Sequence, residues 1–373
     1  MTDCNTDLRE YQHGIDFIPL SNGLYYLFWA SQGNPPSLQY EISGNWQSDI
    51  YVSIIDPGNP VVRPQVFTTE TEAQEPVSAA ITNDGHIMVI NEDGWNTQNQ
   101  VAERYGVYDN GLNGVKPYPQ MVYDGGHSGH VRSVGNNFVA FWANNWIDGG
   151  GVCNLGSGDD VLAYTYDSSG NLLKKVNVAV STQTRDWWPI LAGSQTRAAL
   201  IWQRYVDNQT YATLMISVLD VASGKLVADQ VQLQTHIQYY TYSVEYIPAV
   251  DRFLVLGTYY GTGTGFAYLI DENGNITGSN LSLPSGIIRE SQSVVSNQNG
   301  HAYVVQAKTP SGLMVLDVTA STITWAGTVE DPYLWEYAGV AGIFVAANKV
   351  YMVALSDKGL IPRIFTIPAI PSH

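Results

Sequence analysis

Short runs rich in β-branched and aromatic residues lie between clusters of Gly, Asn, Asp and Pro along the whole chain. At the beginning of the chain such runs cover 16–20, 24–29, 50–55 and 65–68. Such runs, separated by turn-forming residues, are typical of strands joined by turns. No long stretch shows the apolar period of an amphipathic helix. The pattern therefore predicts an all-β protein.

The pattern also repeats. Seven turn pairs, each followed by a strongly β-prone run, recur about 50–60 residues apart. They are Asn22-Gly23, Asp84-Gly85, Asn136-Asn137, Gln195-Thr196, Asp251-Arg252, Asn299-Gly300 and Asn348-Lys349. The residues before the first pair and after the last together make one further step of similar size. The repeat therefore predicts a closed ring of seven four-stranded antiparallel sheets.

The last repeat has only three clear strands, around 339–345, 350–355 and 363–367. The arm Met1–Arg9 precedes the first inner strand. We expect this arm to add the missing fourth strand to the last sheet, because that would close the ring and cover an exposed sheet edge.

The repeat resembles the seven-bladed β-propeller superfamily at large, over the whole chain. The resemblance implies one domain, 1–373, built from four-stranded blades. The chain has no Trp-Asp pair at blade ends, no kelch double glycine and no quinone-binding tryptophan signature, so it points to no narrower family. Propellers serve as lectins, lyases, hydrolases and scaffolds, so the fold alone assigns no function.

The net charge of the chain limits the classes of molecule that it could bind. The net charge is −17 with only 17 basic residues, so a nucleic acid would be repelled. No apolar run has the length of a membrane span, and the first residues lack a signal-peptide pattern. Acidity and low charge density fit an extracellular setting or the surface of a cell or virion. Cys4 and Cys153 could form one disulfide in an oxidising compartment, but by themselves make no metal site.

Loop lengths distinguish two faces. On one face the turns are short; on the other they are long, at 30–48, 91–105 and 143–160. Most tryptophans map to the long-loop face, where indole rings could stack on sugars. We expect Trp29, Trp142 and Trp202 to pack between blades. We expect the ligand to be bound by the remaining aromatic and charged residues near the starts of inner strands: Trp95, Trp146, Trp187, Trp188, Tyr242, Arg289, Glu290, Trp335 and Glu336.

The segment 125–132 places His127 and His130 among small residues that would let a ligand approach the backbone. Three roles stay open for the two histidines. They could act as acid, base or charge neutraliser, share a metal with Asp124, or form a hydrogen-bonded pair that stabilises the loop. We expect neither a metal nor a cofactor.

A second candidate is Arg185, at the start of one inner strand, with Arg204 and Tyr205 at the end of the next strand. The two guanidinium groups could bracket a carboxylate, with Tyr205 as proton donor. Alternatively Arg185 pairs with Asp186 or Glu290. If the protein is an enzyme, we expect His127, His130, Arg185, Arg204 and Tyr205 to converge in one cleft.

Three functions remain. The first is a lectin-like or adhesin-like propeller that binds a glycan or polysaccharide on its aromatic face. The second is a polysaccharide lyase or glycoside hydrolase that acts on an acidic glycan through His, Arg and Tyr. The third is a structural or virion-associated role with other protein subunits as partners. The loops differ in length and chemistry between repeats, which favours one composite site.

Overall fold

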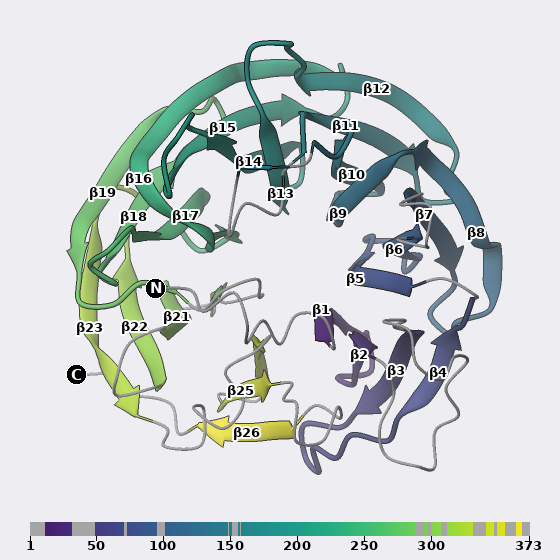
Figure 1. Cartoon of the computed structure of the whole chain (residues 1–373). Helices are drawn as coiled ribbons and strands as arrows, with labels where there is room; N and C mark the ends of the chain where they lie inside the picture. Colours follow the sequence, from purple (N-terminus) through teal and green to yellow (C-terminus); the bar gives the residue numbers. More distant parts are fainter. Residues whose placement is uncertain are drawn as a thin grey trace. The chain divides into compact units, whose positions relative to one another are not determined.

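The computed structural model describes residues 12–31, 49–70, 73–94, 101–147, 149–150, 156, 158–287, 294–296, 300–306, 312–330, 341–346, 349–354 and 363–367. Within these ranges every regular element is a strand, and all the strand pairs are antiparallel (Figure 1). The predicted all-β class is therefore confirmed. Among the described residues, no helix is long and apolar enough to cross a membrane.

Strands follow one another in the chain and in each sheet, so each sheet is a meander. Two compact units divide the chain: unit 1 holds 1–71, 241–270 and 276–373, and unit 2 holds 72–240 and 271–275. The sheets of unit 2 contain β5 (Ala73–Ile81), β6 (Ile87–Gly94), β7 (Val101–Tyr108) and β8 (Gly114–Asp124); β9 (Gly126–Val134), β10 (Asn137–Asn144), β11 (Asp160–Asp167) and β12 (Leu172–Ala179); and β13 (Asp186–Gly193), β14 (Arg197–Tyr205) and β15 (Ala212–Asp220).

The long strand β16 (Lys225–Ile247) passes from unit 2 into unit 1. Its residues up to Ile237 pair with β15, and β17 is its other neighbour in the sheet. Unit 1 contains β1 (Gln12–Pro19), β2 (Tyr25–Ser31), β3 (Asp49–Ile55) and β4 (Gln65–Thr68); β17 (Arg252–Tyr259), β18 (Gly265–Ile270) and β19 (Ile276–Leu283); β20 (Val294–Ser296), β21 (His301–Gln306), β22 (Gly312–Val318) and β23 (Ile323–Glu330); and β24 (Ala341–Ala346), β25 (Lys349–Ala354) and β26 (Arg363–Ile367).

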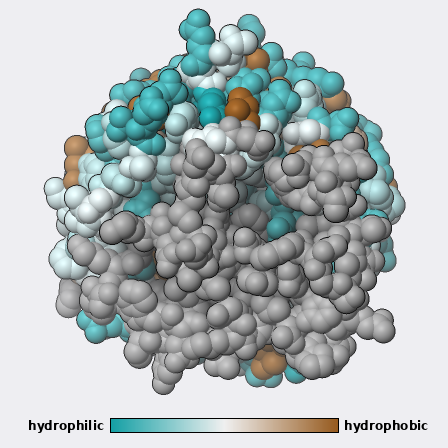
Figure 2. Space-filling model, viewed as in Figure 1, coloured by the Kyte–Doolittle hydropathy of each residue, from teal (hydrophilic) through white to brown (hydrophobic). Residues whose placement is uncertain are grey.

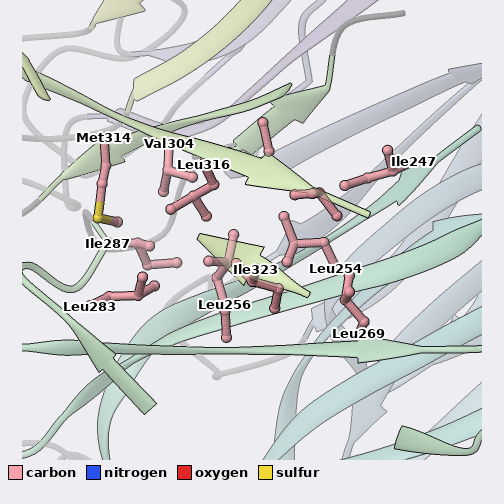
Figure 3. Packing of buried hydrophobic residues seen from close by; sticks show 13 residues of the cluster. Ile247, Leu254, Leu256, Leu269, Leu283, Ile287, Val304, Met314, Leu316 and Ile323 are labelled. Carbon is pink, nitrogen blue, oxygen red and sulfur yellow. The ribbon is translucent and has the colours of Figure 1, made fainter. Parts of the chain in front are cut away.

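The core of unit 1 lies between consecutive sheets. Figure 3 shows one such layer, in which Leu254, Leu256 and Leu269 from β17 and β18 pack against Leu316 and Ile323 from β22 and β23. Their neighbours in β17, Phe253 and Val255, are also buried. Successive strand residues point to opposite faces, so both faces of this strand are covered. Burial of such apolar surface is the main favourable contribution to folding.

The first and last sheets of the chain also pack together within unit 1. Phe344 of β24 lies 4.5 Å from the Tyr25 ring and 5.1 Å from the Phe17 ring, centroid to centroid. The Tyr351 hydroxyl donates to the carbonyl of Pro57 at 2.8 Å. The arm Met1–Arg9 lies outside the described residues, so its addition to the last sheet, the closed ring and the number of seven blades stay predictions.

Three hairpin turns share one side-chain arrangement. Asp109, Asp167 and Asp271 each accept the backbone N–H of the residues two and four positions later. An Asn four residues on donates its side-chain amide to the second carboxylate oxygen. This pattern holds the turn closed.

Exposed apolar side chains lie mainly on the last strands of the sheets, among them Val66, Met121, Leu172, Leu281 and Trp325. On the face in Figure 2 they form separate spots among hydrophilic residues. Isolated exposed apolar residues are normal for a folded domain.

One predicted loop is mostly strand. The sequence interpretation placed a long loop at 91–105, but β6 continues to Gly94 and β7 begins at Val101. Charged residues inside the two strands, Glu92 and Glu103 among them, had obscured their β character. The predicted loop at 143–160 agrees with the end of β10 and the beginning of β11.

Candidate functional site

In unit 2, the first strand of every sheet carries a bulge near its beginning. The pairing register shifts between Gln74 and Val77 in β5, between His127 and His130 in β9, and between Trp187 and Ile190 in β13. Such bulges redirect side chains and recur beside functional sites. Ser128 and Trp188, with φ of 56° and 57°, adopt the left-handed region, which is strained for bulky side chains.

The bulges of β9 and β13 bring aromatic and histidine side chains together. The His127 ring lies 5.5 Å from that of Trp146, and the His130 ring 5.8 Å from that of Trp188. A methyl group on Gly158 would lie 2.8 Å from Trp187 Cβ and 3.1 Å from His127 Cε1, so Gly158 leaves room for both. Trp146 and Gly158, which lie between β10 and β11, are therefore packed beside the two bulges.

Burial decides the charge of His127. Its side chain is fully buried, with Nδ1 3.2 Å from the Ser128 hydroxyl. Burial lowers the pKa of His127 from 6.5 to about 4, although a hydrogen bond with the backbone of Asn144 acts in the opposite direction. The imidazole is therefore neutral at pH 7 and does not neutralise an anionic ligand.

Arg185 organises the loop that carries Trp146. Its Nη1 donates to the carbonyl of Gly149 at 2.9 Å, and its Nη2 to that of Ile147 at 2.7 Å. The guanidinium also lies over the Tyr205 ring, 5.1 Å from its centroid. Asp186, one expected partner of Arg185, is not among these contacts, and Glu290, the other, lies outside the described residues. Arg185 binds loop carbonyls instead.

Arg204 has a different partner. Its Nε lies 2.7 Å and its Nη2 3.2 Å from the carboxylate oxygens of Asp186, which sits opposite on β13. Asp186 is fully buried and also accepts the Trp202 indole N–H at 2.6 Å. The charge of Arg204 thus balances that of Asp186, and the bracket of Arg185 and Arg204 around a ligand carboxylate stays a prediction.

The tryptophans that the sequence analysis assigned to ligand binding differ in how deeply they are buried. Trp187 is 1% and Trp188 5% exposed, so these two indoles pack in the protein and present no open stacking face. Trp187 lies between the rings of Tyr205 and Tyr239 and donates to the Tyr240 hydroxyl at 3.2 Å. Packing is also the role of Trp29, Trp142 and Trp202, as expected.

Trp146, His130, Arg185 and Tyr205 stay half-buried. A methyl group on Gly156 would lie 2.6 Å from Trp146 Nε1, and one on Gly150 2.9 Å from the Tyr205 hydroxyl. Gly156 donates its N–H to the Gly150 carbonyl at 3.2 Å. Trp146 and the Arg185–Tyr205 stack therefore lie against two glycines, Gly156 and Gly150, that are hydrogen-bonded to each other, and we call these three side chains the aromatic site.

Sequence reasoning missed a buried acidic pair. Glu92 and Glu103 sit directly opposite one another on β6 and β7, at 4% and 0% exposure. A methyl group on Gly129 would lie 2.3 Å from the Glu103 carboxyl carbon. The small residues around His127 thus make room for this carboxyl group. The sequence interpretation had expected them to let a ligand approach the backbone. The sequence signal that could have revealed this pair is the presence of acidic residues within β-prone runs.

Other predicted residues lie elsewhere. Tyr242 is buried in unit 1. Outside the described residues lie Trp95, Arg289, Glu290, Trp335, Glu336, Cys4 and Cys153. Within the described ranges, no group of three or more His, Cys, Asp and Glu side chains could hold a metal ion.

No family model and no curated protein sequence matches the chain. Solved structures do match it. A structure of the Mitotic Checkpoint Complex is 9% identical, with a TM-score of 0.57, over 96% of this chain and 90% of that one. The polysaccharide lyase Uly1 is 9% identical, with a TM-score of 0.54, over 96% and 90%. The α-L-arabinofuranosidase Arb93A from Fusarium graminearum is 9% identical, with a TM-score of 0.51, over 97% and 94%. Structures of β-propeller type are among the matches, so the similarity supports a propeller fold and sets neither family nor blade number.

Proposed function

We propose that this protein binds a neutral carbohydrate at the aromatic site of unit 2. The observation that carries the proposal is the convergence of Trp146 and the Arg185–Tyr205 stack on two glycines that are hydrogen-bonded to each other. All three side chains are half-buried. Rings held in this way offer a flat apolar face with polar edges, the combination that sugar C–H faces and hydroxyl groups require.

The charges of the site favour a neutral ligand. Arg204 balances Asp186, Arg185 donates to two carbonyls, and His127 is uncharged at neutral pH. The net charge of −17 adds long-range repulsion against a polyanion. An acidic polysaccharide would therefore meet one positive charge at the site, that of Arg185, whose Nη1 and Nη2 already donate to carbonyls. A single guanidinium compensates few of the charges of a polyanion, which disfavours the lyase hypothesis that the sequence left open.

Fold similarity supports a carbohydrate ligand only in a general way. Two of the matched structures are a polysaccharide lyase and an arabinofuranosidase. Their activities belong to those proteins. What we carry over to this chain is the proposal that a propeller of this type presents a sugar-binding surface.

A glycan array with neutral and uronate-containing oligosaccharides tests the proposal. We expect binding to neutral glycans that persists at physiological salt. A parallel incubation with uronate polysaccharides should produce no absorbance from unsaturated uronate. Exclusive binding of acidic glycans, or release of unsaturated products, would instead support the enzymatic alternative. No binding to any glycan would leave a structural role as the better hypothesis.

A further inference from the structure

Two buried carboxyl groups bind consecutive amides of the β9 bulge. Glu92 Oε2 accepts the N–H of Ser128 at 2.5 Å, and Glu103 Oε2 accepts the N–H of Gly129 at 3.1 Å. These amides lie between His127 and His130. The two carboxyl groups therefore fix the backbone at the point where Ser128 is in the left-handed conformation.

The glycines around His127 fit this arrangement. A methyl group on Gly126 would lie 2.9 Å from Glu103 Cβ, and one on Gly129 2.3 Å from its Cδ. Any side chain at these positions would push Glu103 away from the bulge. The local sequence is thus matched to a buried acid.

Burial, followed by the negative charge of Glu92, raises the pKa of Glu103 well above its usual range, while the Gly129 N–H acts in the opposite direction. Glu103 Oε1 has no hydrogen-bond partner among the described residues, which also disfavours a charged carboxylate. Tyr123 lies opposite Glu103 on β8, and Tyr166 of β11 lies within electrostatic range.

Among the described residues, the cations near Glu103 do not offset two negative charges. The adjacent Arg104 pairs with Asp93 at 2.9 Å, and His127 is neutral at pH 7. The half-buried His130 keeps Nδ1 3.2 Å from the Ser128 carbonyl. Two neighbouring buried carboxyl groups rarely both ionise, and the proton they retain belongs to the pair.

We propose that Glu92 and Glu103 are positioning residues, which share one proton and fix the Ser128–Gly129 bulge, and thereby the orientation of His127 and His130. Loss of the shared proton would place two charges in a buried site and loosen the bulge. The consequence for ligand affinity rests on the proposed function, because His127 packs on Trp146 of the aromatic site.

The histidine NMR signals test the proposal without a ligand. In the wild-type chain we expect the imidazole signals of His127 and His130 to change together as the pH rises above the usual range of a carboxyl group and the pair loses its proton. Glu103→Gln keeps an acceptor for Gly129 and cannot ionise, so this transition should disappear. Glu272→Gln, a control in the same unit that contacts Ser194 instead, should leave it in place.

Glu103→Ala removes the acceptor, so both imidazole signals should move at neutral pH and glycan affinity should fall at least tenfold. Should this variant fail to fold, Glu103→Gln and Glu92→Gln remain decisive. A joint transition of the two imidazole signals that persists in both Gln variants would overturn the proposal. If the signals behave as expected but no glycan binds, the proposed function fails and the positioning role stands.

Discussion

Arg204 binds the buried carboxylate of Asp186 through two nitrogens, Nε at 2.7 Å and Nη2 at 3.2 Å, across the β13–β14 pair. A bidentate guanidinium–carboxylate contact is strong and directional. The pair fixes the beginning of β13, immediately before the bulge that carries Trp187 and Trp188. Arg204 therefore helps to hold the strand that carries the two tryptophans.

Replacing Arg204 with Ala should destabilise the protein by about 3–5 kcal/mol, because a charge buried at Asp186 would lose its partner. Thermal or denaturant unfolding measures this loss. Arg197→Ala is the matched control, since Arg197 pairs with Asp220, whose side chain is 20% exposed. The control should lose about 1 kcal/mol or less. Equal losses in both variants would contradict the assigned role.

Trp187→Ala should lower stability by about 3–5 kcal/mol, the usual cost of removing a large buried aromatic side chain. Trp325, 46% exposed on β23, gives the control: Trp325→Ala should change stability by about 0.5 kcal/mol or less. If Trp187→Ala folds with wild-type stability but loses ligand, Trp187 belongs to the binding surface after all.

His127 should make stability depend on pH in the acid range. Its pKa is about 4 in the folded protein against 6.5 ordinarily, so the unfolded chain binds more protons between these values. The stability due to the neutral imidazole is complete above pH 6.5 and is lost as pH falls towards 4. By this linkage the loss is on the order of 3 kcal/mol.

Unfolding of His127→Gln between pH 4 and 7 checks this effect. The difference in stability between wild type and variant should shrink as pH falls. His236→Gln, at an exposed histidine, should change little across the same range. A difference that does not vary with pH would contradict the neutral, buried state of His127. Glu103 affects the pH dependence of folding stability in the opposite direction. Because its pKa is raised in the folded protein, its contribution to stability is lost as pH rises.

Deletion of Met1–Arg9 tests the predicted closure of the last sheet. An unpaired strand edge in β24–β26 would lose hydrogen bonds and packing. We expect the melting temperature to fall by several degrees. An unchanged melting temperature would show that the arm adds no strand.

Local patterns predicted the strands well. Asn22-Gly23 and Asp84-Gly85 lie in hairpin turns, Asp251 ends the turn before β17, and the strand at 363–367 was placed correctly. Such turns depend on a few neighbouring residues with fixed backbone preferences. The alternation of apolar residues then defines the strands that follow.

Partners across strands could not be predicted in the same way. The sequence placed Arg185 beside Asp186, but the partner of Asp186 is Arg204, which the register of β13 and β14 brings opposite. Glu92 and Glu103 meet for the same reason on β6 and β7. Register is set by the whole sheet, so neighbours along the chain are poor guides to contacts in the site.

The most direct test of the account is the affinity of a neutral glycan for Trp146→Ala, measured by calorimetry with the best glycan from the array. Trp146 is half-buried on the aromatic site, so removing its ring should weaken binding about tenfold or more, equivalent to about 1.4 kcal/mol. Melting should stay near that of wild type, and Trp325→Ala should bind normally. Wild-type affinity in Trp146→Ala would contradict a carbohydrate site at this position.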